Sequence, residues 1–280
     1  MNTLLNYLSK LGSIDRRVIF LLVGLSVLLP LLYPLNIPIT ITNHSRQVFE
    51  AIESLDSGSK ILISFEYGPS TKPEIHPMAI ALLRQLFSKD HQVYGMALWP
   101  DGLFMSNEAF SQVAENEFHL KYGVDYVNLG FKPGNEAVVK GVASDLRKMY
   151  PADTKGNSLD KLPIMKGIKN IKDFDFVFSL SAGYPGTKEW VQYGCDPHNI
   201  PMSTGCTSIQ VTEVLPYVEN GQTHGILAGM PGAAEYEKLV ERKGDATGMM
   251  AAQSIAHVVI VLFIVLGNIT YYINRRKGRE

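Results

Sequence analysis

The residues best able to take part in chemistry lie in short polar, glycine-containing segments, each of which follows an apolar run in the middle of the chain. In an α/β protein such segments end strands, and ligands bind at the carboxyl ends of those strands. The sequence therefore predicts a set of candidate ligand-binding residues, namely Glu66, Tyr67, Ser70, Trp99, Asp101, Ser181, Gly183, Thr187, Thr204, Cys206, Thr207, Gly229 and Gly232.

Three of these segments, 179–187, 203–208 and 229–232, lead directly into predicted helices. Backbone N–H groups and the positive end of a helix could hold an anion there. The sequence contains neither the G-x-G-x-x-G pattern of dinucleotide sites nor the Gly-Lys-Ser/Thr of phosphate-binding loops. Because ordinary turns and helix caps need the same residue types, the segments fit either a small-ligand site or plain connections.

Cys206 is a candidate nucleophile, because it comes just before a predicted helix N-terminus, where a thiolate is stabilised. Catalysis would also need a base, for which His198 and His224 are the candidates; a buried, inert thiol is the alternative. Cys195 is the only other cysteine. A strand predicted over 199–203 would span about 16 Å between the two, whereas bridged Cα atoms lie within about 7 Å, so that strand excludes a disulfide.

Glu66, Glu74 and His76 form the only grouping of carboxylates with an imidazole at a predicted strand end. Glu74 and His76 could ligate a metal, but Pro73 and Pro77 make the segment rigid, and the spacing of the two residues fits no standard metal site. The sequence therefore predicts no metal site and no cofactor here, and it favours a surface loop with polar caps.

The central region alternates between apolar runs and amphipathic stretches of helical period. Strands are predicted over 60–65, 92–99, 125–129, 174–180, 199–203 and 225–228, and helices over 45–55, 77–88, 106–119, 135–149, 187–193, 208–218 and 233–242. Residues 150–172, rich in Pro and Lys, are predicted to form a long connection. Strands interleaved with helices favour an open, mostly parallel, doubly wound α/β sandwich, Rossmann-like or flavodoxin-like.

Two further segments are predicted to be membrane-spanning helices, since both are long and apolar. Residues 249–273 contain no Asp, Glu, Lys or Arg and end with two tyrosines before a basic cluster, as at a membrane interface. Residues 18–35 follow Arg16 and Arg17 as in a secretory signal, but no small-x-small cleavage site follows them. An uncleaved anchor is therefore predicted, and the α/β domain lies between an N-terminal and a C-terminal transmembrane helix.

Basic residues flank both predicted spans on the side away from the central region. Because Lys and Arg stay on the cytoplasmic side, the sequence predicts a cytoplasmic leader (1–17), an extracytoplasmic domain (36–248) and a basic cytoplasmic tail (274–280) of an integral plasma- or inner-membrane protein. The two ends hold 7 of the 26 Lys and Arg residues and 2 of the 27 Asp and Glu residues, which leaves 19 basic and 25 acidic residues, a formal charge of −6. A nucleic-acid partner requires the opposite charge and is not expected.

Gln253 and His257 lie four residues apart and therefore share one face of the C-terminal span. Polar groups are costly in lipid and normally face another helix. This pattern predicts a membrane-helix contact, through self-association or with other subunits. The alternative is that both side chains lie in the hydrated headgroup zone.

These features favour a two-span membrane protein that presents an extracytoplasmic α/β domain, as a non-catalytic subunit or scaffold of a larger membrane assembly. Its predicted partners are the lipid bilayer and other membrane-protein subunits. A small-ligand-binding or sensing domain is the alternative function. A membrane-tethered hydrolase or transferase that uses Cys206, Ser181 or Ser203 is the third interpretation, although no strong catalytic constellation marks the chain as an enzyme.

Overall fold

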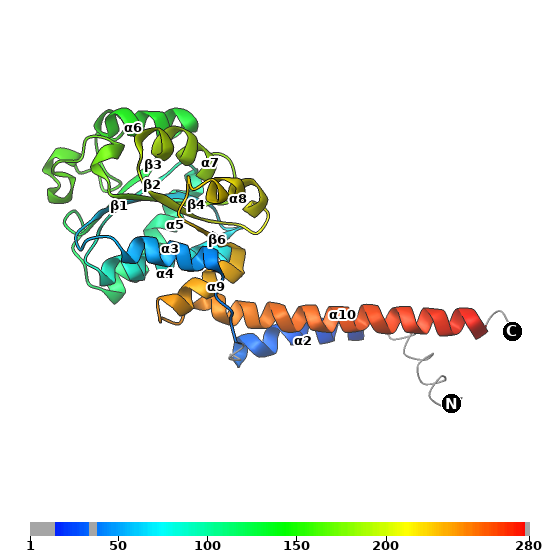
Figure 1. The fold of residues 1–280 in the computed structure, drawn as a ribbon. Helices are drawn as coiled ribbons and strands as arrows, with labels where there is room; N and C mark the ends of the chain where they lie inside the picture. The colour runs from blue at the N-terminus through cyan, green and yellow to red at the C-terminus, as the bar shows by residue number, and fades with distance from the viewer. Residues whose placement is uncertain (1–14, 34–37, 278–280) are drawn as a thin grey trace. The chain divides into compact units, whose positions relative to one another are not determined.

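The computed structural model describes residues 15–33 and 38–277, with side chains as far as Arg275 (Figure 1). The chain divides into two compact units, which are Ile39–Thr247, and Met1–Pro38 together with Gly248–Glu280. Most of the predicted leader (1–17) lies outside the described residues, as does the end of the predicted tail after Lys277.

The unit Ile39–Thr247 is built on a parallel sheet of six strands in the order β3-β2-β1-β4-β5-β6 (Figure 1). The strands are β1 (Lys60–Glu66), β2 (Gln92–Ala97), β3 (Tyr126–Phe131), β4 (Phe176–Ser181), β5 (Met202–Cys206) and β6 (Ile226–Ala228). This is the Rossmann strand order, so the predicted doubly wound α/β fold is confirmed in its Rossmann-like form. The direction in which strands are added reverses between the neighbours β1 and β4.

Continuous apolar runs explain why β1 and β4 form the centre of the sheet. Every residue from Ile61 to Glu66 is buried, and so are all the residues of β4. Burial on both faces is typical of parallel sheets, because crossover helices cover both sides. Ile61 lies beside Phe176 in the register of these strands, and Glu66 lies beside Ser181 at their carboxyl ends.

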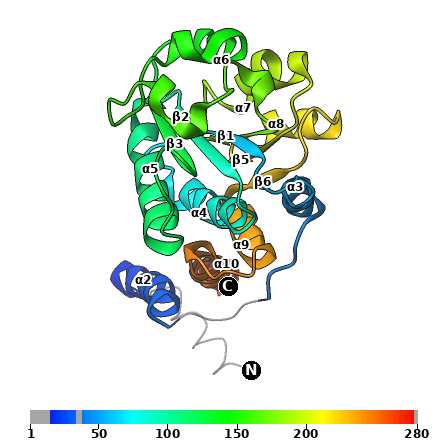
Figure 2. The ribbon, with the colours of Figure 1, turned by 90° about the vertical axis from the view of Figure 1, so that its left-hand side faces the viewer.

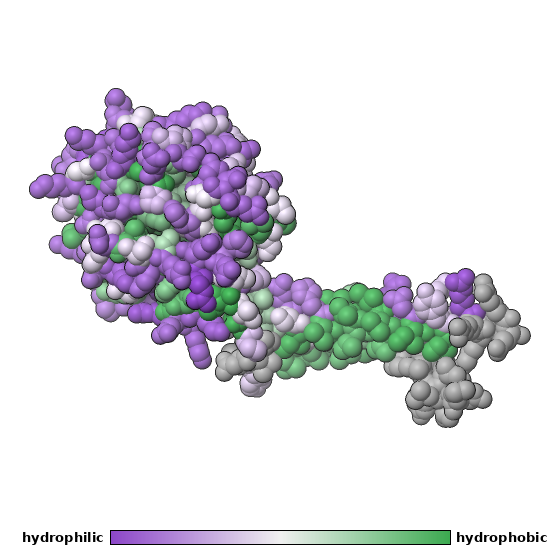
Figure 3. All heavy atoms as spheres, in the orientation of Figure 1, coloured by the Kyte–Doolittle hydropathy of each residue, from purple (hydrophilic) through white to green (hydrophobic). Residues whose placement is uncertain are grey.

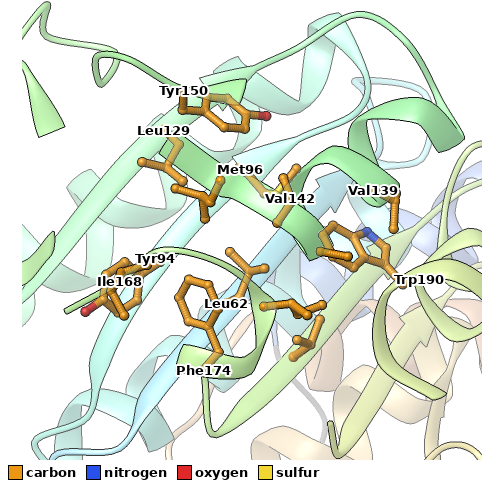
Figure 4. Close-up of a cluster of buried hydrophobic side chains, with 14 of the residues drawn as sticks. Leu62, Tyr94, Met96, Leu129, Val139, Val142, Tyr150, Ile168, Phe174 and Trp190 are labelled. Carbon is orange, nitrogen blue, oxygen red and sulfur yellow. The ribbon is translucent and has the colours of Figure 1, made fainter. Parts of the chain in front are cut away.

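Helices cover both faces of the sheet (Figures 1 and 2). One face carries α3 (Asn43–Glu53), α4 (Lys72–Ser88), α5 (Pro100–Phe110) and α9 (Gly229–Leu239), and the other carries α6 (Glu136–Met149), α7 (Thr187–Glu189) and α8 (Val211–Glu219). The core on the α6 side contains Leu62, Met96, Val142 and Trp190 (Figure 4). There the rings of Tyr94 and Phe174 pack edge to face with their centres 5.0 Å apart.

The structure corrects the positions of several predicted elements. β5 begins at Met202 rather than at 199, because Asn199 has a left-handed conformation (φ 56°) that ends the preceding 3₁₀ turn. The helix predicted over 106–119 begins at Pro100 and continues as a π-helix over Ser111–Glu117. A proline in the first turn removes only an N–H that has no partner within the helix, which favours this early start. The long connection after α6 contains three 3₁₀ turns, Leu159–Lys161, Pro163–Met165 and Ile171–Asp173.

The other unit contains α2 (Arg16–Leu32) and most of α10 (Asp245–Lys277). Within the described residues one helix, Asp245–Arg275, is long and apolar enough to cross a membrane. The predicted span over 18–35 is apolar, but its helix has 17 residues, which at 1.5 Å each extend about 26 Å against a hydrocarbon core of about 30 Å. Two spans were predicted, and one candidate is present in the described chain.

Large apolar side chains are exposed along both helices of this unit (Figure 3). Phe20 on α2 is 73% exposed, and Val258 on α10 is 59% exposed. Exposed apolar surface of this extent is typical of a membrane or protein contact. α10 begins at Asp245, four residues before the span predicted over 249–273.

Candidate functional site

A chain of buried polar side chains joins the neighbouring strands β1, β4 and β5 toward their carboxyl ends. Glu66, the last residue of β1, is fully buried, and its carboxyl group accepts hydrogen bonds from Ser64 and, at 3.3 Å, from Ser179 of β4. The Ser179 hydroxyl lies 3.2 Å from the Thr187 hydroxyl, which in turn lies 2.6 Å from the hydroxyl of Thr204 on β5. The network therefore crosses the point where the strand order reverses, which is the usual ligand position in this fold.

Burial, with a smaller contribution from the negative charge of Glu189, raises the pKa of Glu66 to about 8, although hydrogen bonds from Ser64 and Ser179 oppose the change. At neutral pH Glu66 therefore holds its proton. A protonated carboxyl group can donate a hydrogen bond as well as accept one. The centre of the sheet thus ends in a neutral acid whose protonation responds to the charges around it.

A hollow of about 280 Å³ lies beside this network, at the carboxyl ends of β4 and β5. Three parts of the chain line it, which are the start of α6, the segment 183–193 after β4, and the segment 210–214 at the start of α8. The charged and aromatic residues among them are Glu136, Glu189, Glu213, Lys188, Tyr184 and Tyr193. Three carboxylates against one ammonium group give the hollow a negative charge.

Glu189 is the most deeply buried of these carboxylates, with 5% of its surface exposed. The backbone N–H of Gly186 donates a hydrogen bond of 2.7 Å to its Oε2, which fixes the side chain at the start of α7. Among the ion pairs of the described chain, none involves Glu189. Buried charges are normally paired, so this carboxylate is available to a cation that enters the hollow.

An ammonium group is already held next to the hollow by two of its lining residues. Lys140 Nζ lies 4.1 Å from the centre of the Tyr193 ring and 3.7 Å from Glu136 Oε1. A cation over an aromatic face is attracted by the ring electrons, and the carboxylate adds a charge contact. The Tyr184 hydroxyl reaches the same carboxylate at 3.4 Å.

The structure brings several of the predicted site residues together at this edge. Gly183 and Thr187 line the hollow, and Thr187 is bonded to Thr204. Ser181 donates a hydrogen bond of 3.0 Å to the carbonyl oxygen of Gly183. Trp99, which follows β2, reaches the loop after β4, where its Nε1–H donates to the carbonyl of Pro185 at 2.9 Å.

Other predicted residues lie apart from the hollow. Tyr67 is buried and pairs with His76, Ser70 and Asp101 are exposed, and Gly232 packs on the backbone of Leu227. Thr207 is 5% exposed in the loop after β5. These positions follow strand ends as predicted, but they face different neighbours.

The predicted cluster of Glu66, Glu74 and His76 does not form. Glu66 joins the hydroxyl network, while Glu74 accepts hydrogen bonds of 2.9 Å from both the amide and the hydroxyl of Ser208. His76 Nδ1 lies 2.9 Å from the Tyr67 hydroxyl, and burial lowers the pKa of this imidazole to about 4. No group of three or more metal-binding side chains occurs in the part of the chain that the structure describes.

The structure does not favour Cys206 as an activated nucleophile. It is the last residue of β5 rather than a residue at a helix start, since α8 begins at Val211. Burial, with a contribution from the charge of Glu74, raises the pKa of its thiol to about 12. Cys206 and Cys195 are both free and buried, and the Ser203 hydroxyl is occupied by a 2.6 Å hydrogen bond to the carbonyl of His224.

The acidic and aromatic residues of the hollow were not among the sequence candidates. Glu136, Glu189 and Glu213 lie in the first turns of helices, where an acidic residue is common because it balances the helix dipole. The one available signal was the position of Glu189, which is the third helical residue after a glycine and can therefore bond back to the cap.

A larger hollow of about 920 Å³ lies between the end of α6 and the connection that follows it. Basic side chains dominate its lining, with Arg147, Lys148, Lys161, Lys166 and Lys169 against Asp145 and Asp160. Arg147 is engaged there by the carbonyl of Ile168 at 2.7 Å. None of the predicted ligand-binding residues lines this hollow, and it lies away from the strand ends where this fold binds ligands.

No protein-family model, curated protein or solved structure matches the chain.

The buried acid predicts a specific pH dependence of stability. The pKa of Glu66 is raised from 4.5 to about 8 in the folded chain. Between these values the folded protein holds a proton that the unfolded chain has lost, so stability falls as pH rises through this window. Glu66→Gln should remove this dependence, so the stability of the wild type relative to the variant should fall by about 1.4 kcal/mol per pH unit. Urea unfolding of both proteins in detergent from pH 5 to 8 measures this difference in the free energy of unfolding. If the free energies of the two proteins run parallel against pH, the raised pKa of Glu66 is contradicted.

Proposed function

We propose that this protein is a membrane-anchored α/β domain that binds a small organic cation in the hollow at the carboxyl ends of β4 and β5. The observation that carries the proposal is Glu189, a buried carboxylate that lines the hollow and has no ion-pair partner in the described chain. An unpaired buried charge is destabilising. A bound ammonium group would supply the missing charge.

The size and lining of the hollow support an amine rather than a metal ion. The volume of about 280 Å³ lies just below the usual range of about 300–1,000 Å³ for ligand pockets. Its carboxylates belong to no group of three metal-binding side chains within the described residues. Tyr184 and Tyr193 add aromatic surface, which favours an alkylated ammonium ion.

Binding should also change the protonation of Glu66. The charge of Glu189 helps to raise the pKa of Glu66, and a cation beside Glu189 would offset that charge. The pKa of Glu66 would then fall, and binding near pH 8 would release protons to solvent. Ligand binding is thereby linked to the hydroxyl network at the end of the central strands.

A panel of small molecules tests the cation site. Tetramethylammonium, ethylamine and putrescine should raise the melting temperature of the full chain in detergent, whereas ethanol, acetate and phosphate should not. A free ligand concentration of 100 times Kd should add about 2.7 kcal/mol to the free energy of unfolding. Gln192→Trp, which fills the hollow, and Glu189→Gln should abolish the response.

Glu50→Gln is the matched control, because Glu50 is an exposed carboxylate on α3, away from the hollow. This variant should keep the full response to amines. The proposal fails if no amine stabilises the wild type, or if Glu189→Gln responds as the wild type does.

We further propose that α10 crosses the plasma or inner membrane, with its C-terminal end in the cytoplasm and Ile39–Thr247 outside. The support is the charge pattern. The basic residues Arg275–Lys277 end α10, at the helix end farther along the chain from the α/β unit. This is the arrangement that keeps basic residues cytoplasmic.

Cysteine labelling in intact cells tests this topology. Cys195 and Cys206 are both fully buried, so an introduced cysteine is the main accessible thiol of the folded protein. Ser57→Cys, at an exposed position between α3 and β1, should react with an impermeant maleimide in intact cells. Gly278→Cys, in the tail, should react only after permeabilisation, and labelling of both in intact cells would disprove a cytoplasmic C-terminus.

A role as a subunit of a membrane assembly is favoured by one observation on α10. Gln253 and His257 are both exposed, so no part of the described chain covers this polar face. Polar side chains in lipid normally face another helix. We therefore propose that a helix of a second copy or of another subunit contacts this face.

Replacing both polar side chains tests the contact. Gln253→Leu combined with His257→Leu should weaken association of gently solubilised protein by about tenfold, since interhelical polar contacts contribute roughly 0.6 kcal/mol each. Native mass measurement reports the change. Val258→Leu, a neighbouring exposed position, is the control, and an unchanged mass distribution in the double variant would argue against the contact.

A further inference from the structure

The helix α9 binds the first turn of α10, the helix through which the chain leaves the α/β unit. Glu237 is 3% exposed, and its carboxylate accepts hydrogen bonds of 2.9 Å from the amides of Ala246 and Thr247 and of 2.7 Å from the Thr247 hydroxyl. These amides belong to the first turn of α10, where N–H groups have no partner within the helix. Glu237 therefore caps α10 at the boundary of the unit.

The same helix holds the first folded segment after the chain enters the unit. Glu235 is 7% exposed, and its Oε2 accepts hydrogen bonds from the Thr42 amide at 3.0 Å and the Thr42 hydroxyl at 2.6 Å. Lys238 Nζ donates to the carbonyl of Ile39 at 2.7 Å. Thr42 is the N-cap of α3, so the entry segment and α3 are both tied to α9.

The other end of α9 lies against the loop that follows β5. Gly229 begins the helix with a φ of +57°, and a Cβ at this position would overlap the Ser208 hydroxyl and lie 3.0 Å from Glu74 Oε2. Glu74 in turn holds the amide and hydroxyl of Ser208, each at 2.9 Å. The start of α9 is therefore in close contact with the loop at the carboxyl edge of the sheet.

The same loop leads into the hollow. Gln210, two residues after Ser208, lines the hollow, and its amide bonds to the carbonyl of Thr207 at 2.9 Å. Between its two ends α9 packs on α3 and α4 (Figure 2), and the Tyr236 hydroxyl bonds to Gln85 of α4. One helix thus connects the loop beside the hollow with both boundary segments.

We propose that α9 is a coupling element that makes a displacement of the 207–210 loop move the entry segment, Ile39–Thr42, and the exit segment, Ala246–Thr247, together. The physical basis is the continuity of contacts from Ser208 through Gly229 to Glu235 and Glu237. The ligand proposed above would act through Gln210, but the coupling itself needs no ligand and is testable without one.

Gly229→Ala displaces the start of α9, because the new Cβ overlaps Ser208. In the full chain in detergent, amide hydrogen exchange should rise by about tenfold at Thr42, Ala246 and Thr247 together. Adding Ser208→Ala removes the overlapping hydroxyl and should partly restore all three rates. In the reverse direction, Glu237→Gln should raise exchange at the Ser208 amide, as reciprocity requires.

Gly221→Ala is the matched control. Gly221 also has a positive φ, +74°, but no atom lies within 4 Å of the added Cβ. It introduces similar backbone strain and should leave the three boundary amides unchanged relative to the rest of the domain. The proposal is overturned if Gly229→Ala affects only amides near Ser208, or if the control raises the boundary rates equally.

Ser208→Ala alone serves if Gly229→Ala fails to fold. It removes one of the two hydrogen bonds to Glu74 without adding an atom, and it should raise exchange at Thr42 and Ala246 by a smaller factor. No change at either amide would overturn the coupling. Loss of the amine response with the coupling intact would instead count against the proposed ligand site alone.

Discussion

Burial of the central strand on both faces is the constraint on which the rest of the α/β unit depends. β1 is apolar from Ile61 to Ile63 and packs under helices on both sides. Its side chains therefore contact polar groups only toward its carboxyl end. There Glu66 is shielded from water, and its charged form is unfavourable. The hydroxyl groups of Ser64, Ser179 and, through Ser179, Thr187 satisfy the neutral acid, and this set of side chains forms a polar region next to the middle of the sheet.

The carboxyl edge then separates into two regions with different chemistry. After β4 the chain turns into α7 and fixes Glu189 beside the hollow. After β5 it passes Ser208, which Glu74 holds against the start of α9. The segment from Ser208 to Gln210 belongs to both regions. The proposed ligand site and the proposed coupling path therefore share one loop.

The sheet was predictable from sequence because its strands are continuous apolar runs bounded by Gly and Pro. β5 was the exception. Its residues, Met202–Cys206, are mostly small or polar, and their burial depends on neighbouring strands rather than on their own composition. For the candidate site, the sequence predicted its location at the carboxyl edge of the sheet, but not the charged residues that line the hollow. Glu189 and Glu213 come from helix starts, and their common hollow results from packing of α6, α7 and α8, which no local pattern encodes.

Helical geometry explains how α9 can hold two chain segments with so few residues. Residues two apart on a helix point about 200° apart, whereas residues three apart lie within about 60° of each other. Glu235 and Lys238 therefore share one side, and both bind the entry segment, at Thr42 and Ile39. Glu237 points to the opposite side and binds the exit segment at Thr247. An apolar contact would stabilise either segment without fixing its position, whereas each segment is fixed by a buried carboxylate that accepts several hydrogen bonds, Glu235 for the entry segment and Glu237 for the exit segment. The proposed coupling follows from this arrangement, because a displacement of α9 would reach both segments at once.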